Sequence, residues 1–180
     1  AEAQKAFNSI FRKQPLDWTP DSIVGSVLSY GPSFEEAKPL QDYMIRRVIQ
    51  LAEKHRLPVQ IHTGLLEGFG NVITNSNPVS LINLFIEYRD VKFDIFHGGY
   101  PYTGELATLA KNFQNVFIDM CWLHVISPAR ARSALREWLE TVPANKIIGF
   151  GGDYLFVEGT YGHSIIAREN IARVLSDMVE

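Results

Sequence analysis

Three short apolar segments of this sequence each lead to a residue that can bind a metal ion. Residues 58–64, Pro-Val-Gln-Ile-His-Thr-Gly, have the pattern of a buried strand that delivers His62 and then turns at a glycine. Residues 92–99 deliver His97 in the same way, and residues 146–153 deliver Asp153 after a Gly-Gly pair. One histidine after an apolar run is most often structural, but three ligand-type residues at equivalent positions indicate a shared site.

Segments with the helical spacing of apolar residues lie between these strands. Asn77-Pro78 and Ser127-Pro128 each supply an N-cap followed by proline at the first helical position. Strands are predicted at 22–30, 59–61, 90–96, 115–120 and 146–150, and helices at 1–13, 39–55, 78–88, 103–113, 128–141 and 165–179. This alternation predicts an α/β fold, with βα units that form a parallel sheet in one domain, residues 1–180. The apolar strands indicate that both faces of the sheet are covered.

The ends of the predicted strands are separated by about one βα unit. His62, His97, Asp119 and Asp153 follow one another at intervals of 35, 22 and 34 residues. Sites in parallel α/β folds lie at the C-terminal ends of the strands, so we expect these side chains at one edge of the sheet. A complete (β/α)₈ barrel takes roughly 250 residues. This chain therefore forms either an open sheet or the C-terminal part of a barrel.

Composition excludes several classes of function. A net charge of −3 gives no basic surface for nucleic acid, and no apolar run approaches the length of a membrane span. The glycines after the strands do not form the Gly-x-Gly-x-x-Gly pattern of a dinucleotide site, so no cofactor-binding residues of that kind are expected. The single cysteine, Cys121, fits a reducing compartment and so a cytoplasmic location. Because the chain begins with Ala1 and not Met, we expect a processed start or a piece of a longer protein.

Three motifs together resemble the amidohydrolase superfamily, and in particular its amidohydrolase-related (amidohydrolase 2) group of metal-dependent TIM-barrel enzymes. They are residues 58–64, the Phe-His-Gly-Gly-Tyr-Pro of residues 96–101, and the Gly-Gly-Asp-Tyr of residues 151–154. The resemblance extends from about residue 22 to the C-terminus. It implies a partial (β/α)₈ TIM barrel holding about strands 4 to 8, in which residues 22–30 form the fourth strand and Asp119 ends the seventh.

The resemblance also implies roles for single residues. His62 matches a metal ligand, and His97 matches a residue that binds a second metal or contacts the substrate or the activated water. Asp153 matches an aspartate that binds metal and acts as the general base. The expected cofactor is a divalent metal, Zn²⁺ or Mn²⁺, and the expected reaction is hydrolysis of a small amide, lactone or related compound. Non-oxidative decarboxylation and uronate isomerisation are the alternatives that the same superfamily offers.

Two departures from the family pattern concern the rest of the metal site. No two histidines are separated by one residue, so the His-x-His pair of the family's first strand is absent, and residues 22–30 contain no lysine or glutamate. An inactive partial barrel is therefore a further alternative. An open sheet edge pairs readily with other strands, so we expect association with a second copy or with a missing N-terminal segment.

Asp119, Trp122 and His124 are candidates to line a substrate pocket, with turn capping or packing as the alternative for each. His163 is expected at the surface near the start of the last helix, His55 exposed at a helix C-terminus, and Cys121 buried as a small hydrophobe.

Overall fold

The computed structural model describes residues 34–66 and 71–179. The chain divides into two compact units, residues 1–54 and 55–180. The described part of the first unit is essentially one helix, α3 (Phe34–His55). The predicted helix at 1–13 and strand at 22–30 lie outside the described residues, and the single domain stays a prediction.

Helix α3 begins five residues before the predicted start, so Pro39 lies inside it. His55 ends the helix and is exposed, as predicted.

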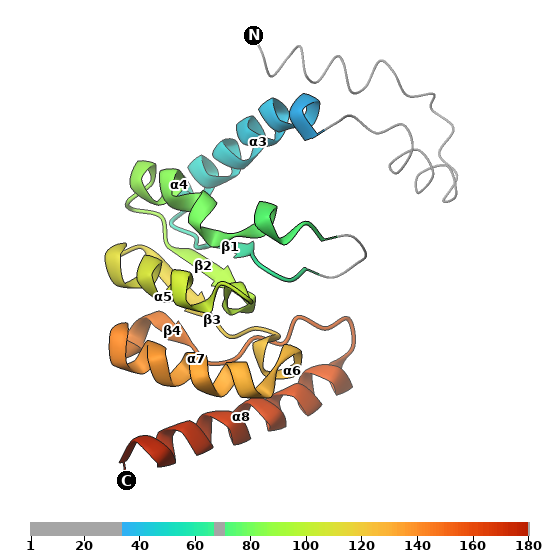
Figure 1. The fold of residues 1–180 in the computed structure, drawn as a ribbon. Helices are drawn as coiled ribbons and strands as arrows, with labels where there is room; N and C mark the ends of the chain where they lie inside the picture. Colours follow the sequence, from blue (N-terminus) through green and yellow to red (C-terminus); the bar gives the residue numbers. More distant parts are fainter. Residues whose placement is uncertain (1–33, 67–70, 180) are drawn as a thin grey trace, which may run out of the picture. The chain divides into compact units, whose positions relative to one another are not determined.

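Four parallel strands form the sheet of the second unit, in the order β1-β2-β3-β4 (Figure 1). They are β1 (Val59–His62), β2 (Phe93–Phe96), β3 (Val116–Asp119) and β4 (Ile147–Ile148). The parallel arrangement predicted from the sequence is confirmed. Strands β2, β3 and β4 are shorter than predicted. A turn in which Val91 N–H donates to Tyr88 O delays β2, and Lys146 belongs to the 3₁₀ segment η4 (Ala144–Lys146).

The helices of this unit are α4 (Ile82–Glu87), α5 (Thr103–Asn112), α6 (Leu123–Ile126), α7 (Pro128–Thr141) and α8 (Val157–Val179), with 3₁₀ segments η1 (Ile73–Ser76), η2 (Pro78–Leu81) and η3 (His97–Gly99). Helix α7 has the predicted bounds, and the Ser127 side chain accepts from Arg130 N–H at its start. The predicted cap at Asn77 also forms, but it opens η2 before α4 begins. The short α6 was not predicted, and α8 begins eight residues before the predicted start.

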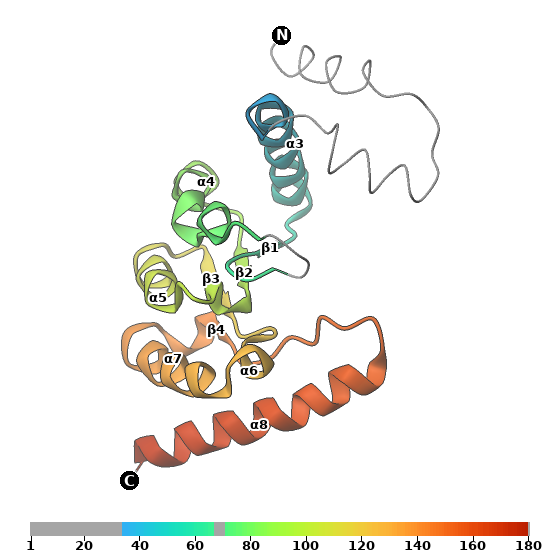
Figure 2. The same ribbon diagram turned by 45° about the vertical axis from the view of Figure 1, so that its right-hand side comes forward.

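The core lies between one face of the sheet and the helices. Phe85 of α4 packs on Phe93 of β2, with ring centroids 5.1 Å apart, and Trp138 of α7 donates its indole N–H to Thr103 O at the start of α5. In both views α4, α5 and α7 lie on the same side of the strands (Figures 1 and 2). Alternate strand residues point towards this core and are buried: Val59, Phe93, Ile95, Val116 and Ile118.

The opposite face of the sheet is more polar than predicted. Gln60 of β1 pairs in register with Asp94 of β2, and Gln60 donates a side-chain hydrogen bond of 3.0 Å to that carboxylate. Gln60, His62 and Ile148 are exposed, so this face is only partly covered by the described residues. The prediction that both faces are covered is therefore wrong for residues 34–66 and 71–179. Across the same residues, no helix is long and apolar enough to span a membrane.

Candidate metal centre

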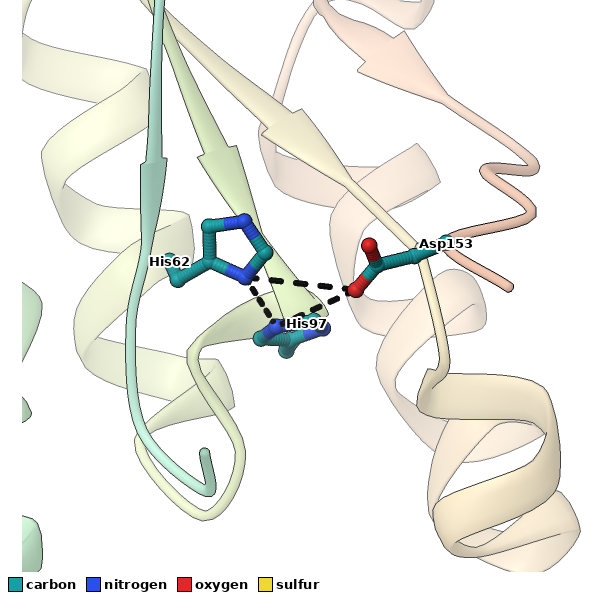
Figure 3. Close-up of side chains that lie close together, drawn as sticks. All are labelled: His62, His97 and Asp153. Carbon is teal, nitrogen blue, oxygen red and sulfur yellow. Dashed lines mark hydrogen bonds and ion pairs between the residues drawn. The ribbon is translucent and has the colours of Figure 1, made fainter. Parts of the chain in front are cut away.

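The fold brings His62, His97 and Asp153 together at the C-terminal edge of the sheet (Figure 3). His62 is the last residue of β1, His97 directly follows β2, and Asp153 lies in the loop after β4. The Nδ1 atom of His62 is 2.8 Å from Nε2 of His97, and Oδ2 of Asp153 is 4.0 Å from each of these nitrogens. Three side chains that are far apart in the sequence thus point their donor atoms at one small region.

Left-handed backbone turns place two of these residues. His97 has φ 64° and Asp153 has φ 50°, conformations that cost a side-chain-bearing residue roughly 1–3 kcal/mol. Gly98 continues the turn with φ 56°, and a Cβ atom there would lie 2.6 Å from the Leu123 side chain. The chain leaving β2 therefore needs glycine directly after His97, which is the reason for the His-Gly-Gly motif.

The surroundings of His97 fix the orientation of its ring. The residue is buried, and its Nδ1 atom lies 3.2 Å from Cys121 O. A carbonyl oxygen only accepts, so Nδ1 carries the proton and Nε2 presents its lone pair to the cluster. Burial lowers the pKa of His97, which favours the neutral ring that a metal ligand must be.

The donor set fits a divalent transition-metal ion. Two atoms that each lie about 2.0–2.2 Å from one ion are at most about 4.4 Å apart. The three separations of 2.8, 4.0 and 4.0 Å meet this limit. Two imidazole nitrogens and one carboxylate are a donor set of catalytic zinc sites, which keep a further position open for water. Among the described residues, these three form the group of His, Cys, Asp or Glu side chains with metal-ligand spacing.

Asp119 is buried near the cluster, at the end of β3. Its Oδ1 accepts a 2.6 Å hydrogen bond from Cys121 N–H, which is the turn-capping arrangement. Burial raises the pKa of Asp119 to about 7, with further contributions from the nearby charges of Asp94 and Asp153. Asp94, which no sequence pattern marked as a site residue, is also buried, and burial raises its pKa as well.

The high pKa of Asp119 predicts a pH-dependent gain in stability for Asp119→Asn. Above about pH 7 the folded protein holds a buried carboxylate that the unfolded chain would expose, and this penalty falls as the pH drops towards 4. The asparagine side chain keeps an oxygen that can accept the hydrogen bond from Cys121 N–H, but it carries no charge. We expect urea unfolding at pH 8 to show a gain on the order of 1–4 kcal/mol, decreasing by about 1.4 kcal/mol per pH unit below pH 7.

Asp90→Asn, which removes an exposed carboxylate, is the matched control and should change little at either pH. A gain for Asp119→Asn that is as large at pH 4 as at pH 8 would contradict a buried, titrating carboxyl.

The structure does not bring His124 to the cluster. Its ring is fully buried, with Nε2 2.9 Å from Gly149 O and Nδ1 3.5 Å from the side-chain nitrogen of Asn170. Arg132 donates to the Asn170 side-chain oxygen, so the Asn170 amide donates to Nδ1 and His124 Nε2–H donates to Gly149 O. His124 therefore ties α6 to the segment that leads to Asp153, which is the packing alternative.

The prediction that His163 is exposed is wrong. Because α8 begins at Val157, residue 163 lies within the helix and is buried against Phe150 and Tyr154, at ring-centroid distances of 5.1 and 5.8 Å. Cys121 is buried, as predicted, and burial raises the pKa of its thiol. Trp122 lies beside the cluster, with its ring centroid 5.8 Å from that of His97.

Comparison with known proteins identifies the family of the chain. The sequence profile of the amidohydrolase family matches residues 24–177. The chain belongs to this family. The resemblance of its three motifs to amidohydrolases is thereby confirmed.

This amidohydrolase-family chain is 32% identical over 151 residues to the protein fluG of Emericella nidulans, covering 81% of the chain and 17% of that relative. Two solved structures share its fold. A protein from Lactobacillus casei ATCC 334 assigned as a metal-dependent hydrolase has a TM-score of 0.63 and 24% identity, covering 78% of this chain and 36% of its own. A uronate isomerase from Bacillus halodurans C-125 has a TM-score of 0.64 and 18% identity, and the match covers 99% of this chain and 48% of the isomerase.

The chain thus spans less than half the length of each of these three relatives. Its four parallel strands and outer helices form a partial TIM barrel, as predicted.

Proposed function

We propose that His62, His97 and Asp153 bind one divalent metal ion, zinc or alternatively manganese, and that the protein hydrolyses a small amide, lactone or related substrate. The convergence of two imidazole nitrogens and one carboxylate oxygen at the strand ends carries this proposal. Membership of the amidohydrolase family supports it. A cytoplasmic location stays a prediction that rests on the single cysteine.

Each residue of the cluster has a distinct part in this chemistry. A bound divalent ion supplies Lewis acidity, which activates water and polarises a carbonyl group. The orientation of the His97 ring is already fixed for metal binding, because its Nδ1–H donates to the Cys121 carbonyl and leaves the Nε2 lone pair free for the metal. Asp153 is the general base, since its side chain is 37% exposed and can exchange protons with solvent. The exposed ring of His62 completes the ligand set from β1.

We further propose that additional polypeptide covers the face of the sheet that lies opposite the core and carries Gln60, Asp94 and Ile148. Asp94 lies on that face, and its buried Oδ1 atom has no hydrogen-bond partner among the residues that the structure describes, a state that costs about 1–3 kcal/mol. Gln60 and Ile148 are exposed on the same face. A segment beyond these 180 residues would supply both the missing donor and the first-strand ligands, whereas a second copy of this chain would supply the donor alone. Light scattering should show association of the purified protein, and a monodisperse monomer with full activity would contradict this.

A substrate panel tests the proposed reaction. Protein loaded with zinc or manganese is incubated with lactones, amides and aromatic carboxylates, and ring opening or amide cleavage is scored against CO₂ release. Hydrolysis that depends on added metal is the expected result. Metal-dependent CO₂ release would assign a decarboxylase, and sugar-acid isomerisation an isomerase. Turnover that is unchanged by a chelator would overturn the metal-dependent function altogether.

A further inference from the structure

The side chain of Trp122 lies against the His97 ring and forms a hydrogen bond to the backbone of Asp153. Trp122 follows β3 with φ 61°, and this left-handed turn directs its indole ring towards the cluster. The ring lies 5.8 Å from the His97 ring and 6.0 Å from the Tyr154 ring. The indole Nε1–H donates a 2.9 Å hydrogen bond to Asp153 O.

Part of the loop that carries Asp153 is exposed to solvent. Leu155 and Phe156, directly after Tyr154, are exposed, and Asp153 itself has a left-handed backbone. Exposed segments with few buried contacts open at low free energy. The Trp122 ring packs on His97 and donates a hydrogen bond to the Asp153 backbone. This bond therefore restrains the loop at the residue that contributes the carboxylate to the cluster.

Resting on the proposed metal-binding function, we propose that Trp122 is a positioning residue that holds Asp153 at a fixed distance from His97. The indole has a single donor, and Asp153 O occupies it. Trp122 thus acts through Asp153, whereas its position in the sequence predicted a place in the lining of a substrate pocket.

Trp122→Phe tests this, because it keeps an aromatic ring and removes the N–H donor. Trp138→Phe is the matched control, since Trp138 Nε1–H also donates to a backbone carbonyl, that of Thr103, but in the core behind the sheet. Zinc affinity is measured by competition with a chelator, under conditions where circular dichroism shows both variants folded. We expect about tenfold weaker binding for Trp122→Phe, the size of effect typical of outer-sphere partners, and less than twofold for Trp138→Phe.

Two further measurements separate positioning from general stability. In an Asp153→Ala background, Trp122→Phe should not weaken zinc binding further, because its effect passes through Asp153. In metal-free protein, amide hydrogen exchange of residues 151–156 should rise about fivefold in Trp122→Phe, the factor that one hydrogen bond provides, and remain unchanged in Trp138→Phe.

Faster exchange in a protein that binds no zinc would sustain the positioning role while overturning the proposed function. Wild-type affinity and wild-type exchange in Trp122→Phe would overturn the positioning role.

Discussion

Replacing His97 with alanine is expected to weaken zinc binding by about a hundredfold or more. The substitution removes a buried nitrogen ligand whose tautomer and orientation are already set by the Cys121 carbonyl, so no other described group replaces it at that position. Isothermal titration of metal-stripped protein with zinc measures the change.

Because His97 is buried, its loss can also destabilise the fold, and a second variant isolates the effect on binding. The His62 side chain is 50% exposed, so His62→Ala should keep the wild-type unfolding midpoint while still weakening zinc binding. His55→Ala, at an exposed histidine outside the cluster, should bind zinc normally. Wild-type affinity in both His97→Ala and His62→Ala would contradict the assigned ligands.

Asp153→Asn is expected to lower kcat by roughly 10²–10⁴, the usual contribution of a general base. The amide oxygen can still face the two histidines, but it cannot take a proton from water. The measurement is kcat and KM on whichever substrate the panel identifies, at saturating metal. We expect kcat to fall far more than KM rises, because the change removes an interaction that matters mainly in the transition state.

The control for this variant is Asp90→Asn, at an exposed carboxylate before β2. A kcat for Asp153→Asn within tenfold of the wild type, with metal content unchanged, would exclude Asp153 as the base.

Local sequence patterns predicted most of the sheet and the three residues of the cluster. His62 and His97 end short apolar segments, and such a segment followed by glycine carries enough local information to place a strand end. Asp153 is 91 residues from His62, so its approach to the histidines depends on the parallel strand order. The alternation of strands and helices supplied that order.

The predicted helix at 165–179 leaves out the first eight residues of α8, which include Gly159 and Gly162, and glycine has a low helix propensity. The structure gives Gly159 a packing role, since a Cβ atom there would lie 2.6 Å from the Phe156 ring and 2.7 Å from the Tyr154 ring. The helix tolerates this glycine because the aromatic side chains need the space. The burial of His163 follows from the same longer helix and was missed for the same reason.

The partners of Asp94 and Trp122 could not be read from the sequence. A single polar residue in an apolar strand does not reveal which face it occupies or which amide it meets. The contact between Trp122 and Asp153 joins residues 31 apart across a turn whose left-handed backbone has no glycine to signal it.

A crystal soaked in zinc and measured at the zinc absorption edge tests the assigned metal centre most directly. The account predicts an anomalous difference peak about 2.0–2.2 Å from His62 Nδ1, His97 Nε2 and Asp153 Oδ2 together. A fully soaked crystal with no peak between these three atoms, or with its strongest peak on other side chains, would contradict it.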